Sequence, residues 1–500
     1  MDRRTFIKMA VISSAGTLYK SNIASAKGIP AKVFDSSDRE RCYVPPAKGV
    51  IETSLTDLFK IGPGPSSSHT IAPLRISGDF LKALESLPKD LMENAQSIQV
   101  RLFGSLSATG RGHRTDRAIL AGLMGQKPET CDPKLMDELG DTTRRYKTTI
   151  NGKTFVVSED MIVWDKIEHD YPFANTMIMR LVGKDGATLF EREYYSTGGG
   201  FFQWKGQPAP ARGQPLRPFG SMAEFKRLAQ ESNKSLHEII LENEKAIMNV
   251  REEEILAHLD LVLNTMENGV TQGLAEEGLL PGPFEFYRKA KRIYECSKNA
   301  SVADGFMQQM SSYALAGSEG NAAGRLGITA PTLGSSGTMP ALVYVMKHHL
   351  KLSQDAMRKG LLAAGLVGFL CKKNASVAGA EVGCQGEIGV ASSMAAAMIS
   401  YATGASLEVT ELAATIALEH HLGMSCDPVG GLVLIPCIER NAFGAIKAYN
   451  AYLLATSELA SQHWEDLDRV IMAMHETGIA MPTMFKEMGT GGLGVTMVDC

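Results

Sequence analysis

The chain has 500 residues, enough for two to four domains, with ordinary globular proportions of hydrophobic (44%) and charged (21%) residues. Its formal net charge of −4 argues against nucleic acid or an anionic membrane surface as a partner. The eight cysteines are too few and too scattered for a disulfide scaffold, which leaves metal binding or plain burial.

The first 26 residues have the pattern of an export signal. An arginine pair, Arg3 and Arg4, precedes an apolar run over residues 9–19, and an A-x-A sequence ends at Ala26. We therefore predict a twin-arginine-like signal peptide over residues 1–26 and, if it is functional, a periplasmic location. A basic tail on a cytoplasmic protein is the alternative. No other stretch reaches the roughly 18 uninterrupted apolar residues of a membrane span, so we do not expect an integral membrane protein.

A polar linker is predicted for residues 27–48, followed by a unit that mixes strands and helices. Residues 71–87 follow a loop and read as a helix, and residues 97–103 alternate as a half-buried strand should. Further strands are expected at 154–157, 176–182 and 188–195. These patterns predict an α/β domain over residues 49–202.

Residues 203–221 are rich in glycine and proline and form the strongest break in the chain. Beyond this second linker the strand signal fades, and amphipathic helices are expected at 222–232, 235–248 and 252–267. Alanine- and glycine-rich helical segments continue to about residue 488. The predicted fold class is therefore α+β, with an N-terminal α/β domain followed by a larger, all-helical domain over residues 222–500.

A serine-rich loop precedes the first long helix of the α/β unit. Its residues Ser66, Ser67, Ser68 and His69 offer hydroxyls and backbone amides at a helix start, a good place to hold a carboxylate or phosphate. A capping loop that binds no ligand is the alternative.

His113 lies on a glycine-flanked turn after a predicted strand. A neutral histidine is the side chain best suited to accept a proton near pH 7, although a histidine on a loop is more often only solvated.

A second Gly/Ser loop contains Thr332, Ser335 and Ser336 and is again suited to small anionic groups. The adjacent Lys372 and Lys373 indicate a solvated face more than a Schiff-base lysine. No glycine-rich phosphate loop that would seat pyridoxal phosphate is present in the sequence, so we do not expect that cofactor.

Three cysteines lie close to glycine or proline in the second half of the chain: Cys384, Cys426 and Cys437. Forty-one residues separate the first pair and ten the second. Three thiolates suit a four-iron cluster with one iron left open, whereas structural zinc sites use four ligands, usually as close-spaced pairs. Three small buried side chains are the plainer interpretation.

Together these segments resemble the single-chain, iron–sulfur-dependent L-serine dehydratases (L-serine ammonia-lyases). The similarity extends from about Ser54 to Cys500, and the C-x41-C-x10-C spacing is typical of the family's cluster cysteines. The shared segments are 57–62, 64–70, 110–116, 195–200, 319–325, 329–332, 374–389, 426–429 and 436–441.

The resemblance implies a substrate-binding-like β-type domain, an α-type helical catalytic domain and a [4Fe–4S] cluster. Cys384, Cys426 and Cys437 would hold the cluster, and its open iron would act as Lewis acid on the serine hydroxyl. A histidine at the position of His113 is the family's favoured base for the α-proton, and His69 would line the site.

The resemblance also bears on the roles of two further positions, Cys500 and Phe173. Cys500 carries a thiol and an α-carboxylate, spaced like the hydroxyl and carboxylate of serine, and family members use such a cysteine as a substrate mimic. We expect Cys500 to be a fourth ligand of the cluster, with a frayed tail as the alternative. Phe173 stands where many relatives have histidine, which puts any proton-transfer role of that position in doubt.

The expected activity is β-elimination of L-serine to pyruvate and ammonia, a step in amino-acid degradation, in a protein expected to be a homodimer. L-cysteine desulfidation or L-threonine deamination on the same scaffold is the first alternative. A non-catalytic amino-acid binder that kept the fold is the second.

Overall fold

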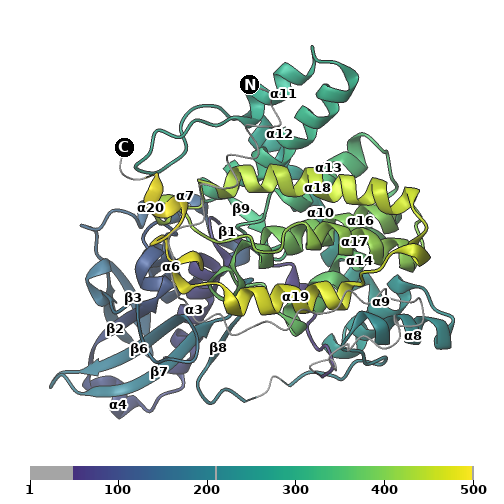
Figure 1. The fold of residues 1–500 in the computed structure, drawn as a ribbon. Coiled ribbons are helices and arrows are strands. Elements are labelled where there is room, and N and C mark those ends of the chain that lie inside the picture. Colours follow the sequence, from purple (N-terminus) through teal and green to yellow (C-terminus); the bar gives the residue numbers. More distant parts are fainter. Residues whose placement is uncertain (1–48, 209–210, 498–500) are drawn as a thin grey trace, which may run out of the picture. The chain divides into compact units, whose positions relative to one another are not determined.

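A mixed five-stranded sheet forms the centre of the N-terminal part of the protein (Figure 1). The structure is a computed structural model that describes residues 49–208 and 211–497. The strand order is β5-β2-β6-β7-β8, in which only β2 and β5 pair in parallel. The strands are β2 (Ala95–Gly104), β5 (Ile162–Trp164), β6 (Asn175–Gly183), β7 (Thr188–Ser196) and β8 (Phe202–Trp204).

Two helices, α3 (Ala72–Glu85) and α6 (Thr115–Leu123), pack with this sheet around a hydrophobic core that includes Leu102 and Met177. Alternate residues of β2 are buried, as the sequence pattern requires of a strand with one covered face. The remaining elements of this part are α2 (Leu55–Leu58), α4 (Lys89–Asn94), α5 (Ser105–Thr109), α7 (Pro133–Glu138) and the hairpin of β3 (Tyr146–Ile150) with β4 (Lys153–Val157).

The C-terminal part is a helical bundle around α16 (Ile388–Ala402), which is buried along nearly its whole length. Its sequence contains no charged residue and many small ones, so neighbouring helices approach it on several sides (Figure 1). The neighbours of α16 in the bundle are α13 (Thr338–His348), α14 (Gln354–Asn374), α17 (Leu407–Glu419) and α18 (Cys437–Ser457). The other helices are α8 (Met222–Ser232), α9 (Leu236–Met248), α10 (Glu252–Ala275), α11 (Ala290–Ser297), α12 (Val302–Ala322), α15 (Gly379–Val382), α19 (Leu467–Ala480) and α20 (Leu493–Thr496).

The predicted α+β class is confirmed, with one short strand inside the helical part. That strand, β9 (Leu326–Ile328), pairs antiparallel with β1 (Ile61–Pro63) from the N-terminal part. Directly after β9, the hydroxyl of Thr329 donates to the Leu58 carbonyl at 2.6 Å and accepts from the Lys60 amide at 2.8 Å. This junction brings the Ser66–His69 loop close to the Thr332–Ser336 loop.

The predicted strands at 97–103, 154–157, 176–182 and 188–195 are confirmed by β2, β4, β6 and β7. The helix expected from residue 71 is present as α3, but a five-residue π-helical turn, Ser67–Ile71, precedes it. The predicted signal peptide (1–26), the linker over residues 27–48 and Cys500 lie outside the described residues.

Across the described ranges, no single helix combines the length and apolarity of a membrane span. By length and composition alone, α14 together with the bent segment 379–386 meets the criteria as a pair.

A buried carboxylate fastens the N-terminal part to the helical bundle. Both oxygens of Glu244 on α9 accept from the Leu55 amide, at 3.0 and 2.9 Å, at the start of α2. Burial raises the pKa of Glu244 from 4.5 to about 7. Between these two values the folded protein holds a proton that the unfolded chain releases, so stability falls as pH rises through that interval.

We therefore expect Glu244→Gln, which imitates the protonated carboxyl, to gain stability relative to the native protein as pH rises. The predicted difference between pH 5.5 and pH 8 is about 2 kcal/mol, from about 1.4 kcal/mol per unit of pKa shift. The measurement is the difference in Tm between the two proteins across that pH range, and a difference independent of pH contradicts the assignment.

Candidate functional site

The serine-rich loop forms the π-helical turn that leads into α3. Ser66 caps this turn, because its hydroxyl accepts from the His69 amide at 3.2 Å. The hydroxyls of Ser66 and Ser68 lie 3.2 Å apart, and Ser67 is also buried. The loop packs closely against the helical bundle, because a Cβ added at Gly64 would overlap the backbone of Asn321.

His69 is fully buried and has a hydroxyl at each ring nitrogen. Its Nδ1 lies 2.8 Å from the Ser68 hydroxyl, and its Nε2 lies 3.1 Å from Ser105 Oγ and 3.2 Å from Thr109 Oγ1. Ser105 donates to the Glu487 carbonyl at 2.7 Å, and Thr109 donates to the Ser105 carbonyl at 3.0 Å. Because both of those hydroxyl protons are committed, we assign the ring proton of His69 to Nε2, which leaves Nδ1 to accept from Ser68.

His113 lies beside His69, with ring centroids 4.6 Å apart and an interplanar angle of 33°. Its Nδ1 lies 2.8 Å from the Thr109 carbonyl, which can only accept, so Nδ1 carries the proton and Nε2 keeps its lone pair. Within the described part of the chain, Nε2 has no hydrogen-bond partner. Burial lowers the pKa of His69 to about 4, and burial with the neighbouring His69 lowers the pKa of His113 to about 3. Both rings are therefore neutral at pH 7.

The three predicted cluster cysteines come together from three segments. Cys384 lies on the short turn Gly383–Gly386, Cys426 lies in an extended loop, and Cys437 begins α18. The first two are buried and Cys437 is partly exposed. A hydrogen bond with Cys384 and burial raise the pKa of the Cys426 thiol, and burial with the charge of Cys384 raises the pKa of the Cys437 thiol.

Arg440, one turn into α18, is the cation nearest this group. Burial alone would lower its pKa, but attraction to the three thiolates and to Asp427 outweighs burial and raises it. Arg440 Nη2 lies 3.1 Å from Asp427 Oδ1, and its Nη1 donates to the Ser425 carbonyl at 2.7 Å. The guanidinium therefore offsets part of the negative charge that three thiolates would bring.

The donor set suits an iron–sulfur cluster, because its three donors are soft thiols. Cys426 is hydrogen-bonded to Cys384, and the charge of Cys384 acts on Cys437, so the three side chains belong to one group. The backbone approaches this group closely at Gly379, because a Cβ there would lie 2.7 Å from Glu387 Oε1 and 3.3 Å from Cys426 Sγ and would crowd both side chains.

Two buried carboxyl groups that the sequence did not reveal complete the site. Glu487 is 4% exposed, and its Oε1 lies 3.3 Å from the Ser68 hydroxyl oxygen and 3.5 Å from His69 Nδ1. Its backbone amide donates to the Cys426 carbonyl at 2.7 Å, so Glu487 joins the histidines to the cysteines. Glu387 accepts from the Gly379 amide at 3.2 Å. Burial raises the pKa of Glu487 to about 7 and, with the charge of Glu487, that of Glu387 to about 8.

The three hydroxyl side chains of the second predicted substrate loop, Thr332, Ser335 and Ser336, face different surroundings. Thr332 hydrogen-bonds to Glu387 and so faces the cysteine group. Ser335 donates within its own turn, to the carbonyls of Ala330 at 3.2 Å and Thr332 at 3.0 Å. Ser336 lines a different cavity.

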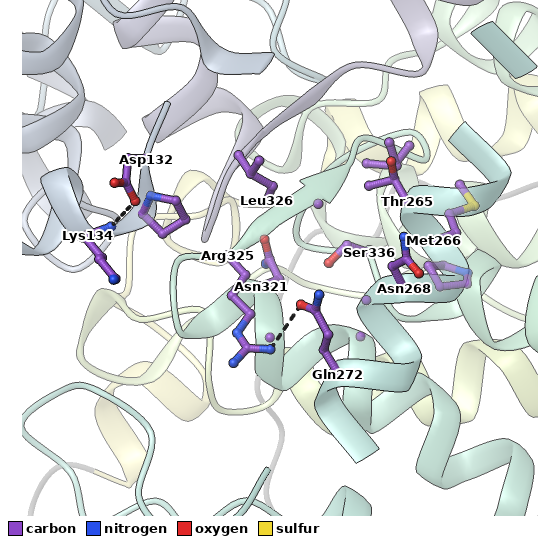
Figure 2. Close-up of a pocket in the computed structure, with 17 residues that line it drawn as sticks. Asp132, Lys134, Thr265, Met266, Asn268, Gln272, Asn321, Arg325, Leu326 and Ser336 are labelled. Carbon is purple, nitrogen blue, oxygen red and sulfur yellow. Dashed lines mark hydrogen bonds between the residues drawn. The ribbon is translucent and has the colours of Figure 1, made fainter. Parts of the chain in front are cut away.

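That cavity, of about 450 Å³, lies between α10, α12 and β9 (Figure 2). Figure 2 shows Ser336 beside Asn321, and Arg325 donating to Gln272 at 3.3 Å. Of the predicted site residues, only Ser336 lines this cavity: the two histidines, the three cysteines, Ser66, Ser67, Ser68, Thr332 and Ser335 are not among its lining residues.

Phe173 packs on Tyr195, with ring centroids 4.9 Å apart, and takes no part in the hydrogen-bond network of the histidines. Two residues later, the buried Asn175 hydrogen-bonds to Glu487. Asn175 is therefore a further site residue that the sequence did not reveal on its own. Cys500, the predicted fourth ligand, lies outside the described residues.

Comparisons with known proteins agree with this arrangement. The family model described as "Serine dehydratase beta chain" matches residues 54–207, and "Serine dehydratase alpha chain" matches residues 231–494. The L-serine dehydratase of Streptomyces coelicolor is 40% identical over 458 residues, covering 89% of this chain and 99% of that protein. L-serine dehydratase 2 of Escherichia coli is 38% identical and the L-serine dehydratase of Helicobacter pylori 36% identical, with the same coverage. With both family models matched in sequence order in one chain, the protein belongs to the serine dehydratase family.

Proposed function

We propose that the protein eliminates water from L-serine and releases pyruvate and ammonia. One observation supports this most: Glu487 links two neutral, buried histidines to a group of three converging cysteines, through His69 on one side and the Cys426 carbonyl on the other. β-Elimination needs a base for the α-proton and a stabiliser for the departing hydroxyl, and these two sets of residues match those two needs.

Cys384, Cys426 and Cys437 would hold a [4Fe–4S] cluster, for which their number and their spacing along the sequence are suited. When bound, such a cluster with one open iron supplies a Lewis acid for the substrate hydroxyl.

His113 is the proposed base. Its Nδ1 is fixed by the Thr109 carbonyl, so the lone pair on Nε2 is the one available to accept the α-proton of serine. The ring of His69 packs on the ring of His113. The Ser68 hydroxyl lies within hydrogen-bond distance of both His69 Nδ1 and Glu487 Oε1. We propose that His69 orients the substrate and keeps the base neutral.

The hydroxyls and amides of the Ser66–Ser68 turn would bind the substrate carboxylate, together with Thr332 from the facing loop. Fixing the carboxylate holds the α-carbon in one orientation relative to the base, which supplies a large part of the rate enhancement. Ser335 supports its own turn, and Ser336 has no direct role in this proposal.

Elimination from L-threonine or L-cysteine on the same residues is the second candidate function, because the base and the thiols do not by themselves distinguish the leaving group. The experiment is pyruvate formation from L-serine by anaerobically reconstituted protein, compared by kcat/KM with L-cysteine and L-threonine. We expect L-serine to have the highest value. Tight serine binding without pyruvate would instead favour a non-catalytic binder.

We further propose export by the signal over residues 1–26, on the pattern of Arg3 and Arg4 alone. A reporter fused after residue 26 should reach the periplasm, and replacing both arginines by lysine should retain it in the cytoplasm. Equal distribution of the two fusions would contradict the proposal.

A further inference from the structure

A second cavity, of about 770 Å³, lies at the junction of the N-terminal part and the helical bundle. It is bordered by α2, by β7 and β8, and by the C-terminal end of α14. Neither site histidine and none of the three cysteines lines it. The serine dehydratase site therefore leaves this cavity unexplained.

The cavity is lined by more basic than acidic groups. Its basic residues are Arg75, Lys205, Arg212, Lys372 and Lys373, and its acidic residues are Glu52 and Asp57. Asp57 is already neutralised by an ion pair with Arg212, which holds the pKa of that carboxyl at about 2 in spite of burial. Lys205 pairs with Glu193 outside the cavity, at 3.4 Å.

Three of the basic groups have no acidic partner. Among the residues that the structure describes, no carboxylate oxygen lies within 4.0 Å of Arg75, Lys372 or Lys373. Arg75 donates to the Gly200 carbonyl at 2.7 Å, and Lys372 lies over the Phe201 ring, 4.2 Å from its centroid. At contact distance, Arg75 and Lys372 are therefore held by neutral groups, although Asp57 attracts both at longer range.

A fourth cation lies beneath the same wall. Lys60 is 8% exposed, donates to the Gly199 carbonyl at 3.1 Å and lies 3.4 Å from the centroid of Phe201. Two ammonium groups therefore share one aromatic ring. Burial and the charge of Arg75 lower the pKa of Lys60, and burial lowers the pKa of Lys372. Such crowding of like charges is costly, and an anion in the cavity would offset it.

We propose that this cavity binds a small polyanion, either a phosphate compound or a dicarboxylate. Three unpaired cations favour a ligand with two or more negative charges, and cavities of this size hold small molecules. A zwitterionic amino acid such as serine is a poor ligand here, since its ammonium group would meet the same cations. The inference rests on these contacts and is independent of the proposed activity.

The ligand would stabilise the junction between the two parts of the chain. Gly199 and Gly200 directly precede the lining residue Phe201 and approach other segments closely: a Cβ at Gly199 would lie 3.1 Å from the Pro331 carbonyl, and one at Gly200 3.0 Å from Ile71. Lys60 is hydrogen-bonded through its backbone to Thr329. An anion that draws these cations together therefore binds the folded junction and not the unfolded chain, which raises Tm.

The test is calorimetric titration of anaerobic holoprotein with inorganic phosphate and, in a separate arm, with succinate. Potassium chloride at matched ionic strength is the reference, and Tm is measured in parallel. We expect saturable binding of one of the two anions and a rise in Tm beyond that in chloride. Phosphate binding alone identifies the phosphate class, and succinate binding alone identifies the dicarboxylate class.

The double variant Lys372→Met/Lys373→Met should raise the Kd of that anion at least about 100-fold, on the basis of about tenfold per lost charge contact. Methionine keeps the apolar contact with Phe201, and removing crowded charge should leave the Tm in chloride unchanged or higher. Lys298→Met is the matched control, because Lys298 also lies over an aromatic ring, 5.0 Å from the centroid of Tyr294, far along the chain from the cavity. No saturable binding of either anion, or equal Kd in the double variant and the control, would overturn the proposal.

Discussion

We expect the substitution His113→Asn to lower kcat for L-serine by a factor of about 10² to 10⁴, the range that a positioned general base contributes. The asparagine amide can still donate to the Thr109 carbonyl, as Nδ1 of the histidine does at 2.8 Å, so the turn should keep its shape. What disappears is the lone pair on Nε2. The measurement is kcat and KM for pyruvate formation, with iron content determined on the same samples.

The accompanying variant is His69→Gln, whose amide can donate to Ser105 and Thr109 much as Nε2 of the ring does. If His69 orients substrate and His113 takes the proton, the glutamine variant should raise KM more than it lowers kcat. Retained α-proton exchange in His113→Asn, or a smaller loss of kcat there than in His69→Gln, would reverse the two assignments.

We expect each of the substitutions Cys384→Ser, Cys426→Ser and Cys437→Ser to abolish the proposed iron binding together with activity, a loss of at least about 10³-fold. A metal Lewis acid contributes several kcal/mol to the transition state, and each 1.4 kcal/mol is a factor of ten in rate. Serine keeps the size of the side chain but replaces the soft sulfur that iron–sulfur clusters require. The measurement is the iron and sulfide content of each variant together with its kcat. Loss of both shows that the cluster is missing, whereas loss of kcat with full iron content shows an effect on the reaction alone.

Two other cysteines supply matched controls. Cys371 is buried in α14 within the bundle core, and Cys296 is exposed on α11. Cys371→Ala and Cys296→Ser should keep full iron content and activity per folded protein. An iron-replete Cys384→Ser enzyme, or loss of iron from the Cys296→Ser control, would show that the three cysteines are not the ligand set.

The cysteines could be found from sequence because their signal is local. Each lies within two residues of a glycine or proline, and their spacing can be read without knowing the fold. Strand β2 was predictable for a similar reason, since the alternating burial from Ile98 to Leu102 leaves a pattern in consecutive residues.

Glu487 could not be found in this way. It reaches the site because Lys486 forms an isolated parallel bridge with Cys426, a contact between residues that lie sixty positions apart. Nothing in the sequence around Glu487 predicts which distant segment it joins. The same limit applies to β9, whose three residues form a strand only because β1 pairs with them.

Ser336 illustrates the opposite difficulty. Its loop composition predicts an anion-binding segment, and neighbouring Thr332 does reach Glu387 beside the cysteines. Which way each hydroxyl points depends on turn geometry, and the turn directs Ser336 into the cavity of Figure 2. Composition locates a binding loop, while the backbone decides which of its side chains face the site.

The central claim is that L-serine binds at an iron–sulfur cluster held by Cys384, Cys426 and Cys437. It is tested most directly by Mössbauer spectra of anaerobically purified, iron-57-labelled protein with and without L-serine. The account predicts about four irons per chain, with one iron whose signal changes on addition of serine while the other three keep theirs. Absence of iron, or a cluster whose spectrum is the same with saturating serine, would contradict it.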